Sequence, residues 1–83
     1  VCAKVNDEFL NFCKENGNDL ITPKPEYNFE GLKDGDCWCV CAIWFKKAVD
    51  AGYACKIFLK STNKKTLEIV SLETLKKHAI DLA

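Results

Sequence analysis

The 83-residue sequence contains no hydrophobic run that approaches the ~18 apolar residues needed to span a bilayer as a helix. It also lacks the basic, apolar and small-residue pattern of a secretory signal peptide. There is no methionine, and the chain opens on Val1. We therefore expect no membrane span. We also expect the natural N-terminus to lie further upstream, and a targeting segment there is an open alternative.

The chain carries no net charge, but its charges are unevenly divided. Residues 1–36 contain four Lys and eight Asp or Glu, giving −4, whereas residues 37–83 contain eight Lys and four Asp or Glu, giving +4. Proteins that bind nucleic acid usually present a concentrated basic face on a basic domain. We therefore predict no nucleic-acid partner. We expect the acidic and basic halves of the chain to attract each other across the fold, or their charged side chains simply to be solvated at the surface. A phosphate-bearing partner for the Lys-rich half is the alternative.

Three of the six cysteines are clustered at positions 37, 39 and 41, and the chain has no Asn-x-Ser/Thr glycosylation sequon. Small disulfide-rich proteins are loop-rich because they lack an apolar core. Here 48% of the residues are hydrophobic and 11% are aromatic, which is enough for a core. The composition predicts one domain over residues 1–83 in a reducing interior, either the cytoplasm or an organelle matrix.

Three helical segments are predicted. Asn6 is a suitable N-cap for a first helix that ends near Gly17. Asp36 is the expected N-cap of a second helix over residues 37–51, whose first nine residues are apolar on every side. Periodicity alone does not separate a buried helix from a buried strand there, but the capping residue favours a helix. A third helix begins at Ser71. Its predicted buried stripe consists of Leu72, Leu75, Ala79 and Leu82.

Two short segments have the alternating pattern of strands. Residues 54–61 alternate apolar side chains with lysines, and residues 67–70 alternate again after a polar turn. The second segment is the expected antiparallel partner of the first. The sequence therefore predicts an α+β fold of three helices, the central one buried, with a small antiparallel β-hairpin.

The segment between the first two helices has no clear periodicity and is broken by two prolines and two glycines. Irregular stretches of this length tend to be functional or disordered, and its aromatic residues argue against disorder. Polar groups beside a helix N-terminus can bind a small anion or metabolite. The candidate ligand-binding residues are Asn18, Asp19, Thr22, Tyr27, Asp36 and Trp38. The alternative is that these residues make local turns and caps.

The cysteines suggest two further kinds of chemistry. Cys37 and Cys39 fall in the first turn of the predicted second helix, where free N–H groups stabilise a thiolate, so they are the candidate catalytic residues. A metal site would draw on Cys2, Cys37, Cys39, Cys41 and His78. The Cys-x-Cys-x-Cys spacing is tighter than that of structural zinc sites. We predict no metal and no cofactor, since buried thiols more commonly act as small hydrophobes.

Blocks along nearly the whole chain resemble the family catalogued as domain of unknown function 2237. The matching residues are Val1-Cys2-Ala3, Glu8-Phe9-Leu10, Gly17-Asn18-Asp19-Leu20, Thr22-Pro23, Pro25-Glu26-Tyr27, Phe29, Gly31-Leu32, Gly35-Asp36, Trp38-Cys39, Cys41-Ala42, Ala51-Gly52, Leu67-Glu68, Leu75 and His78-Ala79. The resemblance implies an intracellular protein of bacteria and some eukaryotes, and names no activity. It also implies that this chain is the C-terminal two-thirds of a longer domain, without an upstream segment that carries further cysteines.

The chain departs from the family pattern at four positions. The family usually has arginine at the positions of Cys37 and Trp44, tryptophan at Phe45 and histidine at Asn63. Two polar positions are thus apolar, which suggests burial by a partner chain. We expect a small intracellular interaction or structural module, a subunit or fragment of a larger assembly whose partners are other protein chains. The alternative is a small-molecule-binding protein or thiol-dependent enzyme that uses residues 18–36 and the helix start at Cys37–Cys41.

Overall fold

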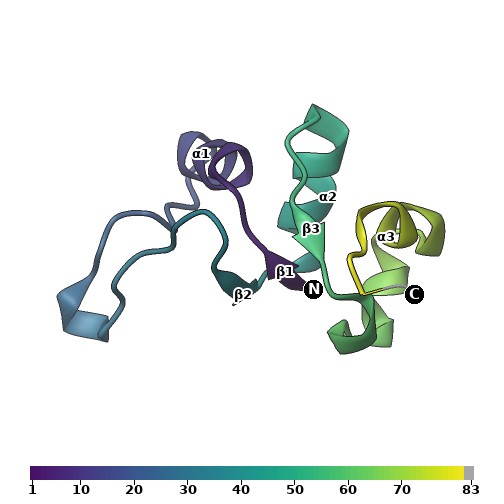
Figure 1. Ribbon diagram of the computed structural model, residues 1–83. Helices are drawn as coiled ribbons and strands as arrows, with labels where there is room; N and C mark the ends of the chain where they lie inside the picture. Colours follow the sequence, from purple (N-terminus) through teal and green to yellow (C-terminus); the bar gives the residue numbers. More distant parts are fainter. Residues whose placement is uncertain (82–83) are drawn as a thin grey trace.

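The computed structural model describes residues 1–81, which form three α-helices, three short 3₁₀ helices and a three-stranded antiparallel sheet (Figure 1). The helices are α1 (Asp7–Glu15), α2 (Ala42–Ala51) and α3 (Leu72–His78), and the strands are β1 (Cys2–Lys4), β2 (Cys37–Cys39) and β3 (Lys56–Ile57). The 3₁₀ helices are η1 (Pro25–Tyr27), η2 (Leu59–Ser61) and η3 (Lys64–Glu68). The predicted α+β class with three helices is confirmed, and the antiparallel element predicted as a hairpin is a three-stranded sheet.

The first strand, β1, is the centre of the sheet, whose strand order is β2-β1-β3. Val1 and Ala3 are buried, whereas Lys4 is exposed and Cys2 is half-buried. This alternation is the period-2 pattern of a strand with one face on the core. The prediction assigned no strand to residues 1–5, although the alternation of Val1, Ala3 and Val5 with polar or small residues was the available signal.

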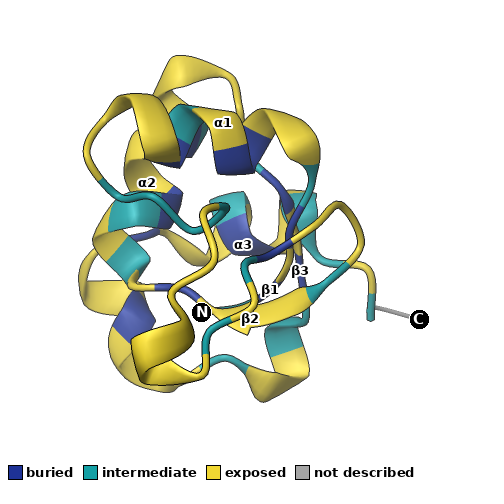
Figure 2. Cartoon of the chain, turned by 90° about the vertical axis from the view of Figure 1, so that its left-hand side faces the viewer, coloured by how far each residue is buried: buried dark blue, intermediate teal, exposed yellow. Residues whose placement is uncertain are grey.

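One hydrophobic core joins the inward face of the sheet to the helices (Figure 2). Its largest fully buried side chains come from all three helices, from β3 and from the residues next to β1 and β3: Val5, Phe9, Leu10, Cys13, Phe45, Cys55, Ile57 and Leu75. The expected central helix contributes only Phe45 and Ala48 as fully buried residues. The core is therefore shared among the elements rather than wrapped around one apolar rod.

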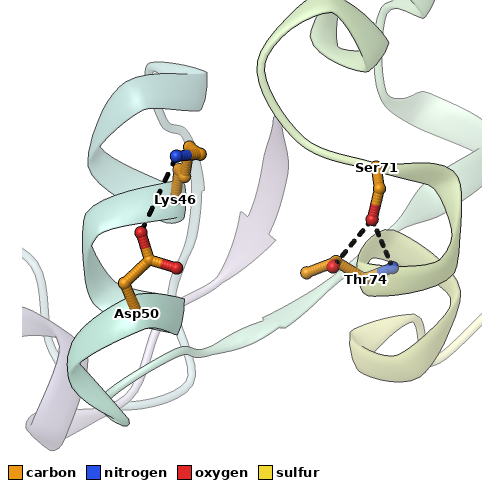
Figure 3. A network of polar contacts seen from close by, with 4 residues as sticks. All are labelled: Lys46, Asp50, Ser71 and Thr74. Carbon is orange, nitrogen blue, oxygen red and sulfur yellow. Dashed lines mark hydrogen bonds and ion pairs between the residues drawn. The ribbon is translucent and has the colours of Figure 1, made fainter.

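The predicted caps of the first and third helices are confirmed. The Asn6 side chain accepts a hydrogen bond from the backbone N–H of Phe9 at 2.8 Å, and the helix that it caps ends at Glu15. Ser71 accepts from the backbone N–H of Thr74 at 3.2 Å, and their hydroxyl groups are 2.9 Å apart (Figure 3). Each bond satisfies a backbone donor that has no partner within its helix.

The predicted start of the second helix is wrong. Residues 37–39 form β2, and the helix begins only at Ala42 after Cys41, its N-cap. Asp36 does not cap this helix; its carboxylate accepts from the backbone N–H of Lys33 at 2.9 Å and closes a turn. The strand is favoured because β1 supplies a hydrogen-bonding partner for these residues, all three of which are exposed.

The predicted pairing of residues 54–61 with residues 67–70 is also wrong. Strand β3 pairs with β1, with Ala3 opposite Ile57, and η3 occupies residues 64–68. Two parts of the predicted third-helix stripe differ as well, since Leu72 is largely exposed and Ala79 follows the end of α3. Leu82 lies outside the described residues. Of the three residues of that stripe that the structure describes, only Leu75 is fully buried.

Residues 18–34, which we call the arm, extend away from the sheet and helices (Figure 1). The molecule accordingly measures 36 × 23 × 20 Å. Near the tip, the backbones of Lys24 and Phe29 exchange two hydrogen bonds of 2.7 and 3.2 Å, and Asn28 adopts a left-handed conformation. The irregular segment is thus an ordered loop with its own turn.

No helix within residues 1–81 is long and apolar enough to cross a membrane.

Candidate functional site

The polar residues predicted to bind a ligand make local hydrogen bonds. Asp19 accepts from the backbone N–H groups of Ile21 and Thr22, at 2.9 and 3.0 Å. Together with the Thr22 hydroxyl, which has the largest effect, these donors lower the pKa of Asp19 from 3.8 to about 2. The backbone N–H of Asn18 donates to the carbonyl of Cys13 and terminates α1. These contacts match the alternative in which the residues form turns and caps.

The two aromatic residues of that predicted set, Tyr27 and Trp38, have different surroundings. Tyr27 is 77% exposed at the tip of the arm. Trp38 packs against Phe29 with ring centroids 5.6 Å apart and thereby holds the arm beside β2. An open hollow of about 380 Å³ on the arm is lined by Pro23, Pro25, Asn28, Phe29 and Glu30. None of the six predicted ligand-binding residues lines this hollow.

Because the pKa of Asp19 is lowered, we expect the free energy of unfolding to depend on this residue at acidic pH. A carboxyl group whose pKa falls on folding stabilises the protein above its unfolded pKa and loses that effect as the pH falls. We therefore expect part of the free energy of unfolding to be lost between pH 3.8 and about 2. Asp19→Ala removes this contribution, so its stability should fall less steeply over that window. Urea unfolding at several pH values measures the slope, with Glu26→Ala on the same arm as the control.

The candidate thiols are exposed, but they do not lie at a helix start. Cys37 and Cys39 belong to β2, so the helix-dipole argument for their activation does not apply to them. His78 is half-buried on α3, where its ring lies at right angles to that of Phe45 with the centroids 5.6 Å apart, and Nδ1 donates to the carbonyl of Thr74 at 2.9 Å. Within residues 1–81, no three Cys, His, Asp or Glu side chains are placed to hold a metal ion.

Besides the hollow on the arm, the structure has a groove with apolar walls that the sequence analysis did not predict. A groove of about 320 Å³, which we call the C-terminal groove, lies among η2, η3 and α3. It is lined by Leu59, Lys60, Thr62, Asn63, Lys64, Leu67, Leu72 and Leu75. Leu75 is 1% exposed and belongs to the core, whereas Leu67 and Leu72 are 48% and 45% exposed. Two large apolar side chains thus remain accessible on one concave surface.

Local hydrogen bonds hold the walls of the C-terminal groove. The Asp81 carboxylate accepts from the backbone N–H groups of Leu59 and Lys60, at 2.8 and 2.9 Å, and fixes η2. Desolvation acts to raise the pKa of Asp81, but these hydrogen bonds outweigh it and leave the pKa below its ordinary value. Asn63 caps η3 by accepting from the backbone N–H of Lys65 at 2.9 Å. The groove is therefore formed before any ligand arrives.

The charges at the C-terminal groove are positive. Lys60 and Lys64 line it, and both are exposed. The Asp81 carboxylate lies outside the groove lining but interacts with Lys60, and it keeps its negative charge while it accepts two backbone hydrogen bonds, so it offsets part of the Lys60 charge. The groove therefore combines apolar walls with a basic rim.

An ion pair lies elsewhere, on α2. Lys46 and Asp50 are 3.8 Å apart, and because both side chains are exposed the pair contributes little to stability (Figure 3).

The fold and these surfaces define a small α+β domain with an exposed thiol face, a projecting arm and an apolar, basic groove. Comparison with known protein families matches residues 1–79 to the family described as an uncharacterised protein conserved in bacteria, domain of unknown function 2237. Since the match covers nearly the whole sequence, the chain belongs to this family. A search of curated proteins found no match.

Proposed function

We propose that the protein is an interaction module that binds a segment of another protein chain in the C-terminal groove. The observation that carries this proposal is the exposure of Leu67 and Leu72 on one concave surface whose floor is the core residue Leu75. Scattered exposed apolar side chains are normal on a protein surface, but apolar side chains gathered in a groove with a polar rim are typical of binding sites.

The partner segment carries an apolar anchor, such as leucine or phenylalanine, flanked by aspartate or glutamate. The apolar anchor would displace water from the leucines, and the flanking carboxylates would face Lys60 and Lys64. The charge of the whole C-terminal half, +4 over residues 37–83, favours approach of the same kind of segment. Such binding weakens as salt is added, because the rim charges are exposed to solvent.

The binding test uses fluorescein-labelled peptides with one central leucine flanked by glutamates, measured by fluorescence anisotropy. The paired probe has lysines in place of the glutamates. We expect the acidic peptide to bind and the basic peptide to bind at least about tenfold more weakly, a difference of about 1.4 kcal/mol. Leu72→Asp should abolish binding of the acidic peptide. Ile43→Asp is the matched control, since Ile43 is 46% exposed on α2 and does not line the groove.

Charge reversal tests the basic rim separately. Lys60→Glu combined with Lys64→Glu should weaken the acidic peptide and strengthen the basic one, whereas Lys77→Glu on α3, outside the groove lining, should change neither by more than about twofold. Equal losses in Leu72→Asp and Ile43→Asp would contradict the proposed groove. Sedimentation that shows a dimer dissociated only by Leu72→Asp would identify a second copy of this chain as the occupant instead.

A further inference from the structure

We propose that Cys2 and Cys39 are a reversible oxidation site, at which a peroxide converts their two thiols into one disulfide. The two residues lie directly opposite each other in the antiparallel pairing of β1 with β2. All six cysteines fall within the described residues and have free thiols in this structure, so it represents the reduced form. The proposal does not rest on the C-terminal groove or its proposed partner, although the backbone N–H of Cys2 donates to the hydroxyl of Thr62 in the groove lining, at 3.3 Å.

The position of this pair in the ladder brings the two side chains close together. Val1 and Val40 exchange both backbone hydrogen bonds, at 2.9 and 2.8 Å. The adjacent pair, Cys2 and Cys39, is therefore a non-hydrogen-bonded pair. Residues at such positions have Cα atoms about 4.5 Å apart. That spacing lies within the range of about 4.4–6.8 Å found in disulfides, so the bond requires little backbone movement.

Both side chains also lie on the same, outward face of the sheet. The neighbours of Cys2 along its strand, Val1 and Ala3, are buried, and side chains alternate between the two faces of a strand, so Cys2 and the residue opposite it point outward. Cys39 is exposed and Cys2 is half-buried, so a small oxidant reaches the pair without unfolding the domain. In contrast, burial raises the pKa of Cys13 to about 11 and that of Cys55 to about 12, which keeps those thiols protonated and unreactive.

The neighbouring thiols are less well placed to bond with Cys2. Cys37 lies opposite Lys4 and is diagonal to Cys2 in the register. Diagonal neighbours are about 7–8 Å apart, which exceeds the Cα separation of a disulfide. Cys41 lies beyond the strand, at the N-cap of α2. The register therefore selects one partner for Cys2 among three exposed cysteines of the same segment.

The reaction is a two-electron oxidation with two steps. The thiolate of Cys39 attacks one oxygen of hydrogen peroxide, so that an S–O bond forms, the O–O bond breaks and hydroxide leaves as water after taking a proton. The thiolate of Cys2 then attacks the resulting sulfenic acid. The S–S bond forms, the S–O bond breaks, and the second hydroxide leaves as water. A dithiol such as dithiothreitol reverses the reaction by thiol–disulfide exchange.

The test treats the folded protein with one equivalent of hydrogen peroxide, blocks remaining thiols with N-ethylmaleimide and digests it with trypsin without reduction. Cleavage after lysine leaves Cys2 on residues 1–4 and the other three exposed cysteines together on residues 34–46. We expect a monomer that has lost two hydrogen atoms, with these two peptides linked and Cys13 and Cys55 unlinked. Dithiothreitol should remove the link.

Three serine variants identify the partner of Cys2. They are needed because the three candidate cysteines lie on one tryptic peptide, so the mass of the linked peptides alone does not distinguish them. Cys39→Ser should reduce the yield of the linked peptides at least tenfold, whereas Cys37→Ser and Cys41→Ser should leave it within twofold of the unmodified protein. The proposal is overturned if the link survives Cys39→Ser, if a dimer linked between chains is the main product, or if Cys13 and Cys55 are oxidised first.

Discussion

Replacement of Phe45 by alanine is expected to lower the free energy of unfolding by about 3–5 kcal/mol, the usual cost of removing a buried phenylalanine side chain. Phe45 is 0% exposed, and its ring packs in a T-shaped arrangement with that of His78 from α3. The ring therefore joins two helices within the core. A domain of 83 residues has a total stability of about 4–12 kcal/mol, so this one substitution removes a large part of it.

Urea unfolding followed by circular dichroism measures this change. Ile43→Ala is the matched control on the same helix, because Ile43 is 46% exposed and its truncation should cost only about 0.5 kcal/mol. Phe45→Leu should fall between the two, since it keeps part of the buried volume. A cost for Phe45→Ala no larger than that for Ile43→Ala would show that α2 does not pack on the core through this face.

Local signals in the sequence were sufficient where one residue decides the structure. Asn6 and Ser71 each place a side-chain acceptor before a helix, and both cap their helices as predicted. The helix-breaking conformation of Gly17, with φ of +92°, likewise follows from the residue type. These features depend on neighbours within a few residues, so a single sequence contains the information.

The strands were less predictable because their partners are distant in sequence. Cys37–Cys39 forms a strand only because residues 2–4 lie beside it, and that pairing spans more than thirty residues. The apolar composition of this strand also hides its position at the sheet edge, since Cys37, Trp38 and Cys39 are all apolar and all exposed. The C-terminal groove was missed for a similar reason. Leu67 and Leu72 fit a helical or strand stripe, and only the three-dimensional arrangement of η2, η3 and α3 shows that both remain exposed along one groove.

Of the four glycines, Gly31 at the base of the arm should be the least tolerant of an added methyl group. Gly31 has φ of +85°, and a Cβ atom there would collide with the backbone carbonyl of Ile21 on the opposite strand of the arm. The adjacent residues are joined by a hydrogen bond of 2.8 Å from the N–H of Leu32 to the carbonyl of Leu20, and Leu32 is buried. The two sides of the arm cannot separate without breaking this contact.

We expect Gly31→Ala to cost about 1–2 kcal/mol for the left-handed backbone and about 1–3 kcal/mol more for the collision. Gly17→Ala is the matched control, because Gly17 has a similar φ of +92° and open space where its Cβ atom would lie. It should therefore show only the backbone cost. Urea unfolding gives both values, and amide hydrogen exchange at Leu32 shows whether the arm opens locally. Equal costs for the two variants would mean that the arm relaxes around the added methyl group, and that its base is not held by the packing of Leu32.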